Sequence, residues 1–205
     1  TAIDLWRSIE ATGTPVHYRK VKKSELGIVE KKLKVKLPPS YVNLVLELGA
    51  PSLGTNTPIA SSALVANLPF AVLRPSEIVQ FTLELRDSVE PDGLDDPDSF
   101  DRICRLLNHA VWFQFGNDPG DGYVFLTDSM DDAGEMRVGA YAHDYLEELD
   151  WSAKSPVVFR SLYESTKHVA RRVADHQAYI AEAIEAANKQ AAKAKVARTT
   201  AAKKR

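Results

Sequence analysis

The stretch that decides the fold is residues 28–49, Ile-Val-Glu-Lys-Lys-Leu-Lys-Val-Lys-Leu-Pro-Pro-Ser-Tyr-Val-Asn-Leu-Val-Leu-Glu-Leu-Gly. Proline presets φ and has no N–H, so it suits the first turn of a helix and not its interior. The residue before a proline is pushed out of the α region. The sequence therefore predicts a helix that ends before the Leu37-Pro38-Pro39 corner, a second helix from Ser40 or Tyr41, and Gly49 as its end.

Apolar residues recur at helical spacing on both sides of this corner. Before it, Leu26, Val29 and Leu33 form a stripe in a helix that Ser24 is suited to cap. A shorter helix is predicted further upstream, from Leu5 to about Thr12. The apolar positions after the corner are Tyr41, Leu44, Val45 and Leu48.

Runs of aromatic and β-branched residues dominate the segment from 111 to 142. Turn-forming stretches rich in Asp and Gly separate them, which is the pattern of β-hairpins. We therefore expect an antiparallel meander, preceded by shorter strands. The expected strands are 63–66, 70–73, 111–115, 123–126 and 137–142.

Helical patterns separate and follow these strands. We expect helices at 74–86 and around 99–107, and a long helix that Ser155 and Pro156 begin and that continues to about Ala187. The predicted fold class is α+β, with an antiparallel sheet in a meander, helices packed on one face and a long C-terminal helix.

A length of 205 residues accommodates one domain of ordinary size and an extension. The composition, with 44% hydrophobic and 26% charged residues, is typical of a globular protein. No apolar run reaches the ~20 residues that a bilayer crossing needs, and no signal-peptide pattern opens the sequence. Cys104 is the single cysteine, which excludes an intrachain disulfide and an all-cysteine metal site. We expect a cytoplasmic protein in a reducing compartment.

The net charge of −2 conceals a strong asymmetry along the chain. Residues 188–205 carry seven Lys or Arg and no acid. Removing these seven from the 26 basic residues leaves 19 against 28 acidic ones, a net charge of −9 for residues 1–187. An acidic body favours a basic partner, because complementary potentials speed encounter and reject wrong partners.

The corner and its two helices resemble the hallmark of the SUKH superfamily of Smi/Knr-like domains. In that hallmark a helix ends in a Gly-Val-Lys-Leu-Pro turn, and Pro-Ser-Tyr opens an apolar helix; here Lys34 stands where the turn usually has Gly. The resemblance covers roughly residues 24–170. Its further elements are Leu73-Arg74-Pro75-Ser76-Glu77-Ile78, Phe115-Gly116-Asn117-Asp118 with Gly122-Tyr123-Val124-Phe125-Leu126, Gly134-Glu135, and Tyr141-Ala142-His143-Asp144.

The resemblance implies a compact α+β binding domain over residues 1–170, with its core at about 24–155. A helical extension at 171–187 and a basic Ala/Lys-rich tail at 188–205, frayed or disordered, exceed the usual domain. Bacterial members include immunity proteins that neutralise toxins, often nucleases, and fungal members regulate cell-wall synthesis. Neither kind is known as an enzyme.

An acidic loop at 87–101 is the candidate docking surface of the body. Carboxylates can stand in for phosphates by pairing with arginines in a basic groove, whereas the alternative is a solvated loop. Aromatic residues on the strands, Phe113 among them, are candidate exposed anchors, and strand alternation allows only one of the Trp112 and Phe113 faces to be core. The candidate partner-binding residues are Asp92, Asp95, Asp96, Asp98, Trp112, Tyr123 and Tyr141.

The basic tail offers at most a weak and unspecific attraction to nucleic acid through counterion release. A solvated tail and a tail that folds back onto the acidic body are the alternatives. The tail residues concerned are Lys193, Lys195, Arg198, Lys203, Lys204 and Arg205.

No pattern in the sequence indicates catalysis, a metal site or a cofactor. The acidic residues around 118–135 do not match a calcium-binding loop, and turn chemistry accounts for them. The glycines at 116, 120 and 122 fit neither a dinucleotide-binding nor a phosphate-binding loop. Cys104 has the apolar helical neighbours of a core thiol. We therefore expect a protein that is not an enzyme and that binds no metal or cofactor.

The function that the residues and the resemblance together favour is that of an immunity protein, which occludes a cognate secreted bacterial toxin by stoichiometric binding. An intracellular regulatory or scaffold protein of the same fold is the alternative. Non-specific nucleic-acid binding through the tail is a weaker alternative. The expected partner is a basic protein and not a membrane.

Overall fold

The computed structural model describes residues 1–53, 70–87, 97–116, 121–142 and 149–202. Its centre is a seven-stranded sheet in which the strands follow chain order and each is antiparallel to the one before. The predicted α+β fold with an antiparallel meander is confirmed. The strands are β1 (Val16–Arg19), β2 (Ala50–Leu53), β3 (Ala71–Val72), β4 (Ala110–Phe115), β5 (Gly122–Leu126), β6 (Arg137–Tyr141) and β7 (Val158–Phe159).

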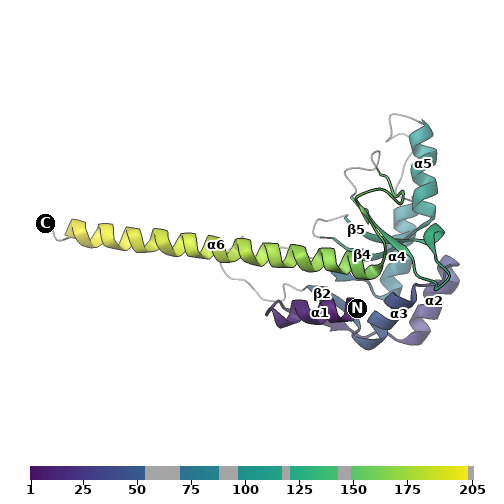
Figure 1. The fold of residues 1–205 in the computed structure, drawn as a ribbon, viewed down its shortest axis with the longest axis horizontal. Helices are drawn as coiled ribbons and strands as arrows, with labels where there is room; N and C mark the ends of the chain where they lie inside the picture. The colour runs from purple at the N-terminus through teal and green to yellow at the C-terminus, as the bar shows by residue number, and fades with distance from the viewer. Residues whose placement is uncertain (54–69, 88–96, 117–120, 143–148, 203–205) are drawn as a thin grey trace.

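Helices precede, interrupt and follow the sheet (Figure 1). The long C-terminal helix is confirmed: α6 starts beside α1 on the body and then projects far beyond the other elements. The helices are α1 (Ala2–Ala11), α2 (Lys23–Leu33), α3 (Pro39–Glu47), α4 (Pro75–Asp87), α5 (Pro97–Asn108) and α6 (Leu162–Ala202), with the 3-10 turn η2 (Thr127–Ser129) after β5.

Several boundaries differ from those predicted. α6 does not begin at Ser155, because Val158 and Phe159 pair with β6 as the short strand β7 and the helix starts only at Leu162. At its other end α6 continues through Ala202, so helix extends well into the basic tail. Lys22 and not Ser24 is the N-cap of α2. The strand predicted at 63–66 lies outside the described residues.

The proline corner joins α2 to α3 as predicted. Lys34 ends α2 with φ of 55°, the left-handed conformation that glycine adopts most readily. The carboxylate of Glu30 accepts the N–H of Leu37 at 3.1 Å, which satisfies a donor at the bend. Pro38 is the N-cap of α3 and Pro39 its first residue, so neither proline removes a helical hydrogen bond.

Gly49 ends α3 as predicted, and its lack of a side chain is required by its surroundings. Its φ is 89°, and a Cβ added there would lie 2.7 Å from the backbone oxygen of Arg19 in β1. Glycine therefore lets the end of α3 approach the edge strand closely enough to continue into β2.

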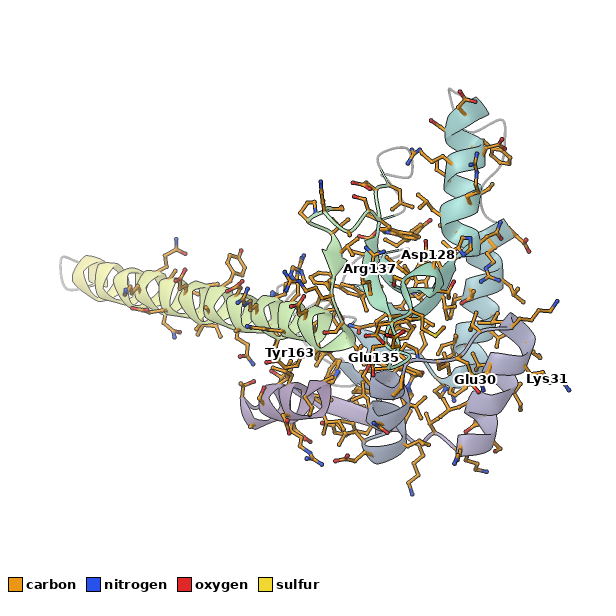
Figure 2. The ribbon with its side chains drawn as sticks, turned by 45° about the vertical axis from the view of Figure 1, so that its right-hand side comes forward. Glu30, Lys31, Asp128, Glu135, Arg137 and Tyr163 are labelled. Atoms are coloured by element: carbon orange, nitrogen blue, oxygen red, sulfur yellow. The ribbon has the colours of Figure 1, made fainter. Side chains whose placement is uncertain are left out.

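The hairpin turn between β5 and β6 secures the N-terminus of α3. Glu135, labelled in Figure 2, lies on this turn. It accepts the backbone N–H of Ser40 at 2.8 Å through Oε1 and the Ser40 hydroxyl at 2.6 Å through Oε2. The turn that presents Glu135 is itself ordered by Asp131, whose carboxylate accepts the N–H groups of Ala133 and Glu135. A carboxylate at a helix N-terminus also interacts favourably with the helix dipole.

Tyr41, one residue further along α3, is fully buried against the sheet. Its ring meets those of Phe113 and Phe125 edge-on, at centroid distances of 6.2 and 5.6 Å. Its hydroxyl donates to the backbone oxygen of Leu73 at 3.0 Å, and burial raises the pKa of Tyr41 far above its usual range. The hydroxyl therefore stays protonated and links α3 to the chain that leaves β3.

We predict that Tyr41→Phe lowers the free energy of unfolding by about 1–3 kcal/mol, because it leaves the buried Leu73 oxygen without its donor while the ring packing stays. Urea denaturation followed by circular dichroism measures this loss. The matched control is Tyr163→Phe, whose side chain is 44% exposed, and it should change stability by less than about 0.5 kcal/mol. Equal effects of the two substitutions would contradict the role given to Tyr41.

Candidate functional site

The aromatic residues predicted as exposed anchors are buried, so that prediction is wrong. Trp112, Tyr123 and Tyr141 expose only 6%, 6% and 5% of their surface, and Phe113 none. Trp112 lies against the ring of Tyr141 at 5.2 Å and donates its indole N–H to the backbone oxygen of Gln114. Tyr123 packs on Phe159 at 6.0 Å. These rings stabilise the body, and their burial leaves little ring surface for a partner.

A register shift in β4 explains why strand alternation failed here. The pairing with β5 shifts between Trp112 and Gln114, so Phe113 is an extra residue on this strand. As a result the rings of Trp112 and Phe115 contact each other at 5.8 Å, although strict alternation places them on opposite faces. Both faces of β4 are buried, because Tyr41 of α3 packs on Phe113 and Phe81 of α4 packs on Phe115.

Of the predicted acidic loop at 87–101, the structure describes only the two ends, and both are helical: Asp87 ends α4, and residues 97–101 begin α5 instead of continuing a loop. Asp92, Asp95 and Asp96 lie outside the described residues, whereas Asp98 is exposed in the first turn of α5. Asp101 follows one turn later, also exposed. Carboxylates in the first turns of a helix interact favourably with its dipole, which helps to begin α5 here.

The basic tail is described as backbone over most of its length. Lys193, Lys195 and Arg198 lie on the last turns of α6, and Lys203, Lys204 and Arg205 lie outside the described residues.

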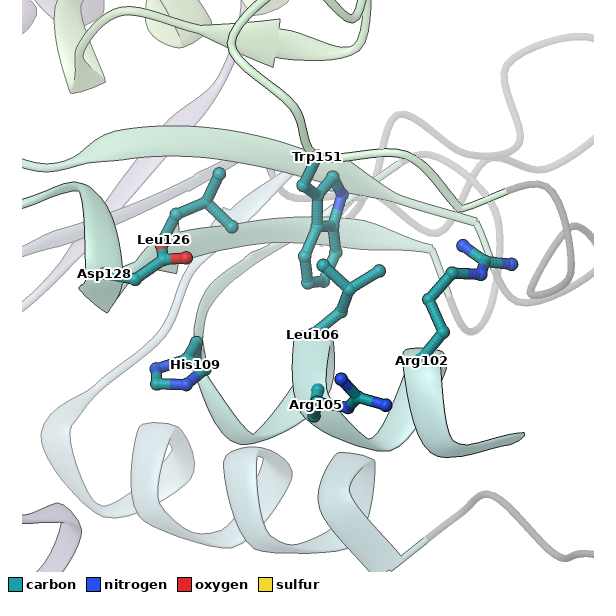
Figure 3. Close-up of a pocket in the computed structure, with 7 residues that line it drawn as sticks. All are labelled: Arg102, Arg105, Leu106, His109, Leu126, Asp128 and Trp151. Carbon is teal, nitrogen blue, oxygen red and sulfur yellow. The ribbon is translucent and has the colours of Figure 1, made fainter. Parts of the chain in front are cut away.

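A cavity of about 530 Å³ lies between α5 and the sheet, and it was not predicted (Figure 3). We call it the α5 groove. Its apolar surface comes from Leu106 on α5, Leu126 at the end of β5 and Trp151. Arg102, Arg105, His109 and Asp128 complete the lining.

The floor of the α5 groove is held rigidly. Trp151 is 5% exposed and donates its indole N–H to the backbone oxygen of Ala140 at 2.9 Å. A Cβ on Gly139 would lie 2.8 Å from that indole nitrogen, so glycine in β6 is what lets the indole lie flat on the sheet. Arg102 closes one end by donating to the backbone oxygen of Leu149 at 2.6 Å.

The rim of the α5 groove carries charge of both signs. Figure 3 shows Trp151 and Leu106 at the middle, with His109 and Asp128 on one side and Arg102 on the other. Arg105, His109 and Asp128 are exposed, whereas Leu126 is 2% exposed. An apolar floor inside a charged rim suits an apolar side chain of a partner that also brings polar groups to the edge.

A second cavity, of about 450 Å³, lies where the start of α6 meets β5, β6 and β7. Burial raises the pKa of Tyr123 to about 12, with Arg172 opposing and Asp121 adding to the rise. His168, which lines the same cavity and lies 5.3 Å from the ring of Phe159, has its pKa lowered below 6.5 by burial and then by Arg172 and Arg171. His168 is therefore neutral at pH 7.

Within the described residues, no group of three or more His, Cys, Asp or Glu side chains could hold a metal ion. Cys104 is partly buried on α5 and carries a free thiol. None of the described helices is both long and apolar enough to cross a bilayer.

Comparison with known proteins adds no assignment: no family model and no curated protein matches the chain. The sequence did contain one signal for the α5 groove. Arg102 and Leu106 lie at helical spacing on one face of the predicted helix, and His109 follows just after its end at the next such position. Trp151 and Leu126 come from distant segments, and only the folded sheet brings them to that face.

We predict that His168 titrates below its ordinary pKa of 6.5, and that Arg172→Gln raises this pKa by removing one of its causes. The His168 imidazole therefore binds its proton at a higher pH in the unfolded chain than in the folded one. As a result the free energy of unfolding decreases as the pH falls below about 6.5. Titration of the imidazole resonances by NMR, assigned with His168→Gln, measures the pKa of His168 in the native chain and in the Arg172→Gln variant. The control Arg160→Gln should leave the pKa unchanged; an increase as large as that of Arg172→Gln would contradict the assignment.

Proposed function

We propose that the chain is a protein-binding domain of the immunity type, which neutralises a secreted bacterial toxin by covering its active cleft and catalyses no reaction. The observation that carries this proposal is the placement of two features on α5. The helix follows the acidic loop and begins with Asp98 and Asp101, and its remaining turns form one wall of the α5 groove. One element thus presents negative charge beside a concave apolar site.

The α5 groove supplies a concave site for an anchor of the partner, in which Leu106 is the partly exposed apolar side chain. Interface energy concentrates in a few side chains that fill well-packed, desolvated pockets. A groove whose floor is already fixed by the Trp151 hydrogen bond loses little conformational entropy when it is filled. The exposed rim residues Arg105 and Asp128 can then pair with polar groups around that anchor.

The net charge of −9 on residues 1–187 favours a basic partner. Nucleases present basic clefts to nucleic acid, and carboxylates can occupy such a cleft in place of phosphates. Long-range attraction raises the association rate more than it raises affinity. In this proposal Asp92, Asp95, Asp96 and Asp98 steer the encounter, and the α5 groove holds the complex. The site of action is the cytoplasm of the producing cell.

The toxin assignment depends on the resemblance of residues 24–170 to SUKH domains, and an intracellular regulator of the same fold is the alternative. Immunity genes lie beside toxin genes, so the product of the neighbouring gene is the partner to test. We expect its activity to fall in proportion to added protein and to vanish at equimolar ratio. Inactivation by substoichiometric amounts would instead indicate an enzyme.

For that complex we predict that Leu106→Arg weakens binding at least ~10-fold, because the new side chain fills the α5 groove and brings a charge onto its apolar floor. Isothermal titration calorimetry measures the change, and circular dichroism confirms that the variant is folded. The matched control Leu46→Arg alters a leucine on α3 that is 41% exposed. Unchanged affinity of the Leu106 variant would exclude the groove as the anchor site.

The steering role is tested by kinetics of the same complex. Charge reversal of Asp95 and Asp96 to Lys should lower the association rate and its salt dependence, with a smaller effect on dissociation. The double variant Glu10→Lys with Glu47→Lys makes the same change of net charge on α1 and α3. If the two double variants slow association equally, net charge and not the acidic loop does the steering.

A further inference from the structure

The cavity where the start of α6 meets β5, β6 and β7 has the dimensions and lining of a small-molecule site, and we call it the α6 cavity. Its volume of about 450 Å³ lies in the range of ~300–1,000 Å³ that ligand pockets occupy. Apolar and aromatic side chains form most of its wall, including Tyr123, Leu149, Val157 and Phe159. No described residue lines both this cavity and the α5 groove, so the two sites can be tested separately.

The aromatic wall of the α6 cavity is already packed in place. Phe159 of β7 contacts two other rings, that of Tyr123 on β5 at a centroid distance of 6.0 Å and that of His168 on α6 at 5.3 Å. Tyr141 of β6, which lines the same cavity, lies 5.2 Å from the ring of Trp112. Filling a pocket whose walls are already ordered costs little conformational entropy.

Tyr123 brings to this wall a hydroxyl that has no hydrogen-bond partner among the described residues. The side chain is only 6% exposed, and buried polar groups are normally hydrogen-bonded. Burial raises the pKa of Tyr123 to about 12, so the hydroxyl is protonated at neutral pH and can donate. A ligand with an acceptor oxygen in the α6 cavity would satisfy it.

Arg172 and Asp121 bring charges of opposite sign to the same cavity. Beyond the effect of burial, Arg172 lowers the pKa of Tyr123 and Asp121 raises it, so both charges act at this hydroxyl. No ion pair joins the two residues among the salt bridges of the described chain. Asp121 has a further interaction, and a carboxylate can accept several donors at once. The cavity therefore offers a cation and an anion that do not neutralise each other.

The other two ionisable groups of the lining do not compete for a charged ligand. The carboxylate of Asp150 already accepts the backbone N–H of Ser152 at 2.8 Å and its hydroxyl at 3.2 Å. His168 is neutral at pH 7, because burial and then the two arginines that follow on α6 lower its pKa. Arg172 and Asp121 are therefore the charges that select a ligand.

We propose that the α6 cavity binds a free amino acid with an apolar or aromatic side chain. The guanidinium of Arg172 pairs with the α-carboxylate of the ligand, to which the Tyr123 hydroxyl also donates. The carboxylate of Asp121 accepts the α-ammonium group, and the ligand side chain packs on the wall that contains Phe159. A ligand with a single charge leaves the opposite protein charge without a partner, which costs free energy once water is displaced. A zwitterion satisfies both.

Isothermal titration calorimetry of the full chain tests this proposal, with L-phenylalanine and L-leucine as probes. We expect both amino acids to bind saturably. Phenylpropionate lacks the ammonium group of phenylalanine and phenethylamine lacks its carboxylate, so each should bind at least ~10-fold more weakly than L-phenylalanine. Equal affinities for the three aromatic ligands, or no saturable binding of either amino acid, would overturn the proposal.

Two substitutions identify which protein charge meets which ligand charge. Arg172→Gln should weaken binding of L-phenylalanine and phenylpropionate at least ~10-fold and leave phenethylamine unchanged. Asp121→Asn should weaken L-phenylalanine and phenethylamine and leave phenylpropionate unchanged. The matched control Arg171→Gln alters the adjacent exposed arginine, which does not line the cavity, and should bind all three ligands as the native chain does. A cavity variant that loses all three ligands equally would contradict the role given to its charge.

Discussion

The burial of Tyr41 is the constraint on which the rest of the body depends. Its ring fills the space between α3 and the paired strands β4 and β5, and its hydroxyl reaches the chain leaving β3. Tyr41 is the third residue of α3, and a shift of one residue along this helix would turn its side chain away from the sheet. The prolines set the start of α3, because they suit the helix edge and exclude its interior. The corner thus determines which residue meets the sheet.

The same corner links parts that are distant in sequence. Glu135 reaches Ser40 from the β5–β6 turn, 95 residues further along, and so places the hairpin relative to α3. Through Tyr41 the hairpin strand β5 then packs against the helix that its own turn secures. The strand next to β5 is β6, whose Ala140 and Gly139 receive the indole of Trp151 and so position the floor of the α5 groove.

Much of this architecture could be predicted from local patterns. Proline and glycine chemistry predicted the corner and the end of α3, and turn residues predicted the meander. The burial of the predicted aromatic anchors could not be predicted, because alternation along a strand does not show that α3 covers one face of the sheet and α4 the other, and the register shift after Trp112 breaks the alternation itself. The α5 groove was missed for a different reason: three of its seven lining residues, Leu126, Asp128 and Trp151, come from segments distant from α5, and no local spacing relates Trp151 to Leu106. Residues grouped only by tertiary packing leave no periodic signal.

The opposite charges of the body and the tail have separate consequences because α6 is continuous. A flexible tail would fold back onto the acidic body, which would cancel the field that attracts a basic partner. Residues 178–202 of α6 instead form a rigid rod about 37 Å long, which holds Lys193, Lys195 and Arg198 several Debye lengths from most of their own body, where screening removes the attraction. The body thus keeps its acidic field for one partner.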